Sequence, residues 1–204
     1  MIGTLIYGLT IGGILYIISI GLSLTFGTMR IVNFAHALVY TVGAYVLAVA
    51  LRTLGVGFLA AAAIGTAAVL PLAYVVEAFV IRRLYGESLD YAIIATYAVL
   101  LIGVDLIKWI WGATPIPLSD PIGRDVEILS VSLPVYRLVI IGLALALHGA
   151  LFLFFRKTIV GKIVVAGLDD KDAVRGLGID VDRYFSIVFL LGSALAALGG
   201  VLYA

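Results

Sequence analysis

The 204-residue chain contains no cysteine, and charged residues make up only 12% of it. Without cysteine, disulfides, thiolate metal sites and cysteine nucleophiles are all excluded. The scarcity of charge is equally informative, because a typical soluble domain is about a quarter charged. A chain that is 64% hydrophobic has too few polar groups to cover its surface in water. The composition therefore predicts an integral membrane protein.

Several motifs of enzymes and nucleotide-binding proteins are also missing from the sequence. It has no HExxH zinc motif, no Walker-type glycine loop, no Ser/His/Asp pattern and no basic run that would bind nucleic acid. We therefore expect a protein that is not an enzyme and has no cofactor, no metal site and no nucleic-acid partner. If ATP drives its activity, another subunit must bind that ATP.

The chain does contain long apolar runs. A membrane-spanning helix needs about 20 mostly apolar residues. Six segments meet this requirement, at residues 2–26, 34–54, 57–81, 91–111, 135–155 and 184–204. The runs are continuous, whereas the strands of a membrane barrel alternate over about ten residues. The predicted fold class is therefore all-α, a polytopic helical membrane protein with about six spans. Polar and small residues interrupt the second segment, and we expect it to be short or re-entrant.

The basic residues predict the orientation in the membrane, because Lys and Arg gather in cytoplasmic loops. One side of the predicted bundle receives nine of them: Arg30, Arg82, Arg83, Arg156, Lys157, Lys162, Lys171, Arg175 and Arg183. The other side receives four: Arg52, Lys108, Arg124 and Arg137. This difference places segment 156–183 in the cytoplasm. It places the N-terminus and the proline-rich loop 112–133, which includes Pro115, outside.

Segment 156–183 is a long and densely charged stretch between two apolar runs, so we expect it to contact a soluble partner. Its residues 170–177 predict a short amphipathic helix, with Ala173 and Leu177 on one face and Val174 beside them. Asp169, Asp170 and Asp172 lie where the start of a helix favours acids, and Gly178 suits its end. A helix of this kind docks into a groove on a partner.

Ionisable groups within the predicted spans are few, and each has a functional and a structural interpretation. Asp105 and Lys108 share a helix face and are expected to pair, with Lys108 reaching the outer interface. Glu77 is expected to be neutralised by Arg82 or Arg83. His148 stands alone in an apolar run and is expected to be a hydrogen-bonded packing residue.

A polar corner joins the first two predicted spans, in the sequence GLSLTFGTMRIVNFAH at residues 21–36. Asn33 and His36 fall on one face if the second helix begins there, and Asn33 is a candidate helix cap. Asn33, His36 and Asp105 are the candidate polar residues of a translocation path. A purely structural role at the corner is the alternative for Asn33 and His36.

The corner sequence, followed by Gly-Ala-Tyr at residues 43–45, resembles the permease subunits of branched-chain amino-acid ABC importers. Those proteins carry a closely similar GLSLxFGxMxxxNFAHG segment followed by GAY. The segment 156–183 and the following GSALAALGGVL at residues 192–202 are similar to the coupling loop and the next span of the same family. The resemblance extends over essentially the whole chain, although glycine is usual where this chain has Ala37.

The resemblance implies a plasma-membrane permease subunit, multi-pass, that imports branched-chain amino acids or related small polar compounds. It implies a sister permease, two cytoplasmic ATP-binding subunits and an extracytoplasmic solute-binding protein as partners, besides membrane lipid. The ATP-binding subunits would dock on residues of the coupling loop, namely Ala166, Asp169, Asp170, Ala173, Val174, Leu177 and Gly178. Residues 1–204 would form a single transmembrane permease domain that lacks its C-terminal spans.

Two other functions are compatible with the sequence. An ion-coupled secondary transporter would need buried charges for a proton or sodium ion, and Asp105 and Glu77 are the available groups. A membrane scaffold without transport activity is the second alternative. Co-purification with ATP-binding subunits separates the importer from both.

Overall fold

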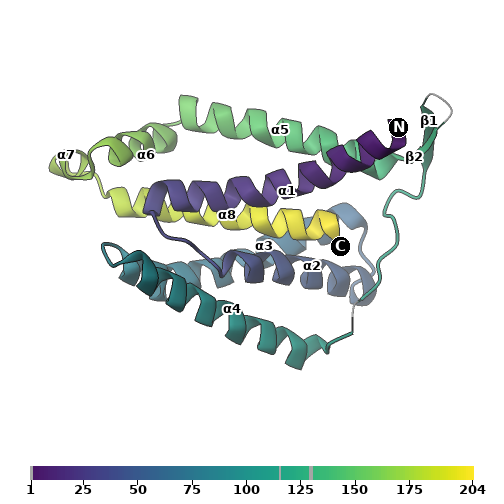
Figure 1. Cartoon of the computed structure of the whole chain (residues 1–204), viewed down its shortest axis with the longest axis horizontal. Helices are drawn as coiled ribbons and strands as arrows, with labels where there is room; N and C mark the ends of the chain where they lie inside the picture. Colours follow the sequence, from purple (N-terminus) through teal and green to yellow (C-terminus); the bar gives the residue numbers. More distant parts are fainter. Residues whose placement is uncertain (1, 115, 129–130) are drawn as a thin grey trace.

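The computed structural model describes residues 2–114, 116–128 and 131–204, and six of the helices described there are long and apolar enough to cross a membrane. They are α1 (Ile2–Met29), α2 (His36–Thr53), α3 (Phe58–Phe79), α4 (Leu89–Trp111), α5 (Val135–Lys157) and α8 (Val181–Tyr203). Figure 1 shows them running side by side in one bundle. The all-α polytopic fold and the six predicted spans are thus confirmed, with boundaries shifted by a few residues.

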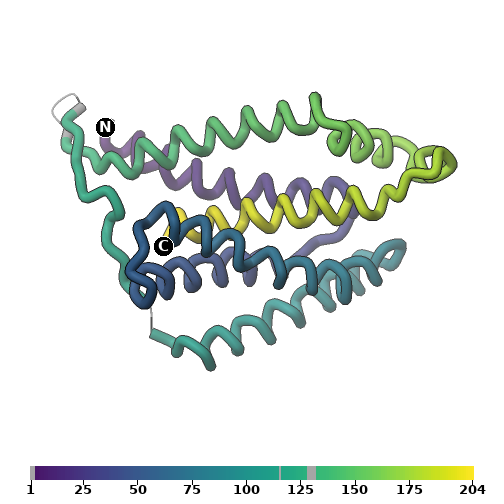
Figure 2. The backbone as a smooth tube through the Cα atoms, turned by 180° about the vertical axis from the view of Figure 1, so that it is seen from behind, coloured from purple at the N-terminus to yellow at the C-terminus, as the bar shows by residue number. Residues whose placement is uncertain are grey.

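The remaining elements lie at the two ends of the bundle (Figures 1 and 2). At one end, the helices α6 (Ile159–Asp169) and α7 (Lys171–Gly176) form the α6–α7 hairpin, and the short 3-10 helix η1 (Ile81–Leu84) follows α3. At the other end, β1 (Asp125–Ile128) pairs antiparallel with β2 (Val131–Pro134). We call these the hairpin end and the strand end.

Two predictions about the connecting segments need correction. Segment 156–183 is helical for most of its length, because α5 and α8 extend into it and α6 fills much of the rest. The loop 112–133 carries a strand pair that the sequence did not suggest. The predicted position of Pro115 in that loop, like residues 129–130, lies outside the described residues.

Helix α8 lies at the centre of the bundle, between α1 on one side and α2 and α3 on the other (Figure 1). In α8 the buried share of its most apolar stretch is 72%, compared with at most 39% in the other five spans. A helix in this position transmits any displacement to three neighbours at once.

Glycines explain how the neighbours of α8 come so close. A Cβ atom on Gly192 would lie 2.6 Å from the carbonyl oxygen of Gly21, and one on Gly43 would lie 2.8 Å from that of Ala197. Real Cβ atoms do not approach backbone this closely, so larger residues would push the helices apart. Since lipid provides no hydrophobic force between helices, such close backbone packing is what holds a membrane bundle together. These glycines therefore allow close packing of the helices around α8.

The corner between α1 and α2 runs into the bundle before α2 begins, so α2 has only 18 residues (Figure 1). The prediction of a short second span is confirmed. Arg30 starts the corner in a left-handed conformation, with φ of 55°. Thr96 on α4 holds the corner from the side, because its hydroxyl accepts a hydrogen bond from the Phe34 amide at 3.2 Å. Helix α4 thus helps to hold the corner between α1 and α2 in place.

Candidate functional site

The α6–α7 hairpin is shaped by capping residues in its own sequence. The Thr158 hydroxyl accepts a hydrogen bond from the Gly161 amide at 3.1 Å and caps α6. Asp170 interrupts the helix and caps α7, because its carboxylate accepts from the Ala173 amide at 2.9 Å. Gly178, with φ of 79°, redirects the chain toward α8. These local signals make two short helices where a single one was predicted.

The capping geometry also corrects the predicted roles of the acids. Asp169 is the last residue of α6 and so lies at the end of a helix, where its charge is unfavourable to the helix dipole. Asp170 and Asp172 do lie at the start of α7, as predicted.

One face of the hairpin packs against the start of α8. Val164 of α6 and Val174 of α7 are buried in a cluster with Val181, Phe185 and Val188 of α8. Gly167 brings α6 close, because a Cβ there would lie 2.6 Å from a methyl carbon of Val181. This apolar contact attaches the hairpin to the central helix of the bundle.

The opposite face of the hairpin is exposed, and Leu177 with 78% exposure is its most prominent apolar side chain. Of the seven residues predicted to contact an ATP-binding subunit, six are exposed: Ala166, Asp169, Asp170, Ala173, Leu177 and Gly178. Val174 differs, because it faces α8. The sequence predicted that Val174 lies beside Leu177 on the exposed face of one helix. In the structure, α7 ends at Gly176, and Leu177 follows the helix. Val174 is therefore part of the attachment.

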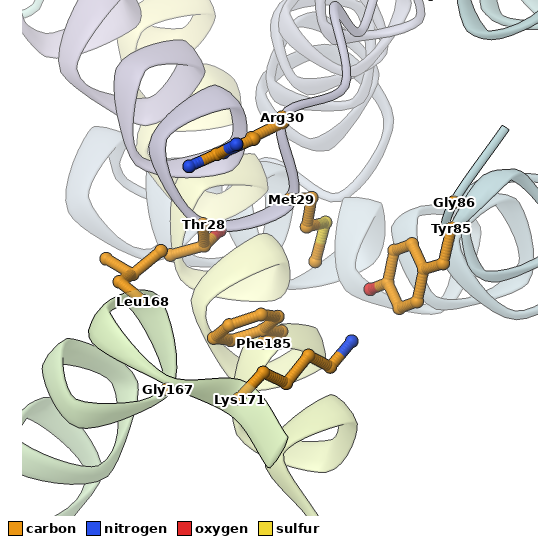
Figure 3. Close-up of a pocket in the computed structure, with 9 residues that line it drawn as sticks. All are labelled: Thr28, Met29, Arg30, Tyr85, Gly86, Gly167, Leu168, Lys171 and Phe185. Carbon is orange, nitrogen blue, oxygen red and sulfur yellow. The ribbon is translucent and has the colours of Figure 1, made fainter. Parts of the chain in front are cut away.

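A cleft of about 250 Å³ separates the hairpin from the ends of α1 and η1. Figure 3 shows Lys171 extending across it toward Tyr85, with Phe185 beside it and Arg30 on the far side. The Lys171 ammonium lies 5.3 Å from the centre of the Tyr85 ring and 5.5 Å from that of Phe185. Burial, followed by the charges of Glu77 and Asp182, raises the pKa of the Tyr85 phenol above its ordinary value. Tyr85 therefore stays neutral.

A buried polar cluster ties α3 to α8 behind this cleft. Glu77 is fully buried and accepts two hydrogen bonds from the Arg82 guanidinium, the shorter at 2.8 Å. The Ser186 hydroxyl on α8 lies 2.7 Å from the same carboxylate. Of the two predicted partners of Glu77, Arg82 and Arg83, the structure shows Arg82. The role of Ser186 was missed, since nothing in the sequence indicates which helix faces Glu77.

A second cavity of about 590 Å³ lies between α1 and α2 and opens to the surface of the bundle, because Ile11, Leu15 and Tyr203, which line it, are exposed. Its lining is mostly apolar and includes Ile14, Ile18 and Tyr40. Asn33 and His36 also line it, so the structure brings together two of the three residues predicted for a translocation path. Cavities that bind small ligands have about this size and character.

Asn33 and His36 each keep a buried polar atom without a hydrogen-bond partner among the described residues, Oδ1 and Nδ1 respectively. His36 Nε2 lies 3.1 Å from the Ile18 carbonyl oxygen. Because a carbonyl only accepts, Nε2 must carry the hydrogen, which leaves Nδ1 of the neutral ring as an acceptor. The predicted capping role of Asn33 is wrong, because α2 starts later, Ala35 occupies the cap position and no side chain caps the helix.

Asp105 lies elsewhere. It belongs to α4 at the edge of the bundle, its side chain is 81% exposed, and it is 3.7 Å from Lys108. The predicted pairing is confirmed, but Asp105 does not line the cavity. His148 is hydrogen-bonded, as predicted, because its ring lies 2.5 Å from the Tyr16 hydroxyl, but it lies exposed on the outside of the bundle and is not a buried packing residue.

Comparison with known proteins shows the family to which the chain belongs. Residues 4–204 match the family described as branched-chain amino acid transport system / permease component. The chain belongs to this family. The resemblance seen in the corner and the coupling segment is therefore confirmed, and the protein is a multi-pass membrane component of a transport system. No solved structure was found to match the chain.

The alignments with individual relatives cover nearly the whole chain. The high-affinity branched-chain amino acid transport system permease protein LivH of Escherichia coli strain K12 is 28% identical, with 96% of this chain and 68% of the relative aligned. The corresponding protein BraD of Pseudomonas aeruginosa is 26% identical, with 97% and 69% aligned. A probable LivH of Methanocaldococcus jannaschii is 28% identical, with 97% and 63% aligned.

Proposed function

We propose that this permease is a subunit of an ATP-driven importer that carries branched-chain amino acids or related small polar compounds across the plasma membrane. It acts with a sister permease, two cytoplasmic ATP-binding subunits and an extracytoplasmic solute-binding protein. The observation that carries the proposal is the α6–α7 hairpin, which is attached to α8 by one face and leaves Leu177 exposed on the other. A surface of this kind is suited to receive a soluble partner.

The charges support a cytoplasmic position for the hairpin. The nine basic residues counted above all belong to the hairpin end of the bundle, and the other four to the strand end. Because cytoplasmic segments carry the excess of Lys and Arg, the hairpin end faces the cytoplasm. ATP-binding subunits, which bind nucleotide in the cytoplasm, then meet the hairpin directly.

The hairpin's exposed acids favour a partner surface with basic residues. Asp169, Asp172 and Asp180 are exposed in the same segment as Leu177. An apolar anchor with a charged rim is the usual composition of a protein interface. The ATP-binding subunit is therefore expected to offer an apolar pocket for Leu177 and basic side chains for the acids.

The cavity between α1 and α2 supports a substrate with an aliphatic part. Ile14, Ile18 and Tyr40 provide an apolar wall, while Asn33 and His36 provide the few polar atoms. A branched aliphatic side chain buries its methyl groups against such a wall at about 25 cal/mol per Å² of apolar surface. Asp105, which is exposed and paired with Lys108, contributes nothing to this cavity.

Reconstitution tests the proposal. The permease, purified with the partner subunits that it retains, is placed in proteoliposomes with the solute-binding protein, and uptake of radiolabelled leucine is followed with and without ATP. We expect uptake that requires ATP and persists when ionophores collapse the proton and sodium gradients. Uptake that is independent of ATP and abolished by an ionophore would identify an ion-coupled transporter instead.

A further inference from the structure

Asp182 forms the charged link between the α6–α7 hairpin and the central helix. It lies in the first turn of α8. One carboxylate oxygen lies 2.7 Å from the Lys171 ammonium, and the other accepts a hydrogen bond from the Arg175 guanidinium. Both cations belong to α7, so a single carboxylate holds both of its basic residues.

The geometry makes this link stronger than an ordinary surface ion pair. The side chains of Asp182 and Lys171 are only 28% and 32% exposed, and the Lys171 ammonium also contacts the rings of Tyr85 and Phe185. Partial burial reduces screening by water and salt. The neighbouring apolar contact of Val174 excludes solvent from one side. Asp182 therefore fixes α7 relative to α8.

The link continues into the bundle one turn further along α8. The Ser186 hydroxyl, 3.0 Å from the Asp182 carbonyl oxygen, also lies 2.7 Å from the Glu77 carboxylate on α3. A hydroxyl has one hydrogen to donate, and the charged carboxylate at the shorter distance is the stronger acceptor. Because that hydrogen goes to Glu77, the backbone of α8 itself connects the hairpin contacts of Asp182 with the α3 contact of Ser186.

Helix α8 also reaches the cavity between α1 and α2. Its 23 residues span about 34 Å at 1.5 Å per residue. Along that length it packs without intervening side chains against α1 at Gly192 and against Tyr40 of α2 at Gly200. Since packed helices move as rigid bodies, a tilt of α8 changes the separation of the two helices that line the cavity.

We infer that Asp182 is the positioning residue that converts movement of the α6–α7 hairpin into movement of α8, and thereby couples ATP hydrolysis to opening of the α1/α2 cavity. The inference rests on the proposed function and adds a residue to it. Asp182 contacts neither nucleotide nor substrate in this account. Without its carboxylate, the hairpin would still dock through its exposed face but would move without carrying α8 with it.

The test is the variant Asp182→Asn in the reconstituted complex, with uptake and ATP hydrolysis measured in the same proteoliposomes. We expect the ATP-binding subunits to remain bound and hydrolysis to continue, while uptake per ATP falls about fivefold or more, which is the lower range of couplings between sites. Asp182→Glu should restore the ratio. An unchanged ratio, or equal losses of hydrolysis and uptake, would overturn the inference.

Asp105→Asn is the matched control. Asp105 also belongs to an ion pair, with Lys108 at 3.7 Å, but its side chain is 81% exposed and lies on α4, away from the hairpin and from the α1/α2 cavity. It should leave uptake per ATP unchanged. If Asp182→Asn fails to assemble, the double variant Lys171→Gln/Arg175→Gln removes the same contacts from the hairpin side and leaves α8 intact. A normal ratio in that double variant would equally overturn the inference.

Hydrogen exchange separates failure of this inference from failure of the proposed function. In the purified permease without partners, Asp182→Asn should accelerate exchange of the α7 amides and leave those of α4 unchanged. Unchanged α7 exchange would reject the link even in a complex that transports. If the wild-type complex does not import, the proposed function fails, and the exchange result still decides whether Asp182 holds the hairpin.

Discussion

The Ser186 hydroxyl on α8 lies 2.7 Å from a carboxylate oxygen of Glu77 on α3 and joins residues that are 109 positions apart in the chain. Glu77 is completely buried, and its negative charge is balanced by the Arg82 guanidinium. A buried ion is tolerated only where its lone pairs are satisfied in this way. The cluster therefore fixes α3 to the helix that carries the hairpin.

Arg82 and its neighbour Arg83 provide the first prediction. Arg82→Met should destabilise the protein by about 3–5 kcal/mol, because it leaves Glu77 buried without a counter-charge. Arg83 is exposed and its guanidinium lies 5.9 Å from the centre of the Phe79 ring, so Arg83→Met should cost less than about 0.5 kcal/mol. The midpoint of thermal unfolding in detergent measures both. Equal shifts for the two variants would refute a structural role for the Glu77 cluster.

Glycine packing along α8 gives the second prediction. In Gly200→Ala the new Cβ would collide with the backbone of Tyr40, which no side-chain rotation relieves. We expect a loss of about 3 kcal/mol, at the upper end for overpacking. Gly12→Ala is the control, because a Cβ at Gly12 meets nothing within 4 Å. The thermal midpoint of Gly12→Ala should stay near that of the wild type. A larger drop of the midpoint in Gly12→Ala than in Gly200→Ala would contradict the packing described for α8.

The third prediction concerns Asn33, whose replacement should reduce transport without reducing stability. Because its Oδ1 atom is buried without a partner among the described residues, Asn33→Leu should leave stability unchanged or raise it by about 1 kcal/mol. Uptake of leucine should nevertheless fall, since one of the few polar atoms of the α1/α2 cavity is lost. Leu22→Met, which changes an apolar residue of the same cavity, should retain uptake. Normal uptake in Asn33→Leu would remove Asn33 from the translocation path.

The spans were predictable because their signal is local. A run of about 20 apolar residues has only one stable conformation in lipid, a helix whose backbone bonds are all internal. Helix α6 was missed because residues 159–169 were treated together with the charged residues after them. Thr158 as a cap, followed by Ile159, Ile163 and Val164 at helical spacing, was a usable signal.

The candidate site was only partly predictable, because its contacts join distant parts of the chain. The sequence predicted that Arg82 or Arg83, both nearby in the chain, neutralises Glu77, but the contact of Ser186 depends on α8 lying beside α3. Asp182 carried no sequence signal among the many charges of the hairpin. Asn33 and His36 were correctly grouped, although Asn33 precedes α2 and does not cap it.

The central claim is that an ATP-binding subunit docks on the exposed face of the α6–α7 hairpin, and site-specific photo-crosslinking tests it most directly. A photoreactive amino acid replaces either Leu177 on the hairpin or Val126 on β1, which is 40% exposed at the strand end. After illumination of the intact complex in membranes, position 177 should yield a covalent adduct with the ATP-binding subunit, and position 126 should yield none. An adduct from position 126, or its absence from position 177 in a complex that transports, would contradict the account.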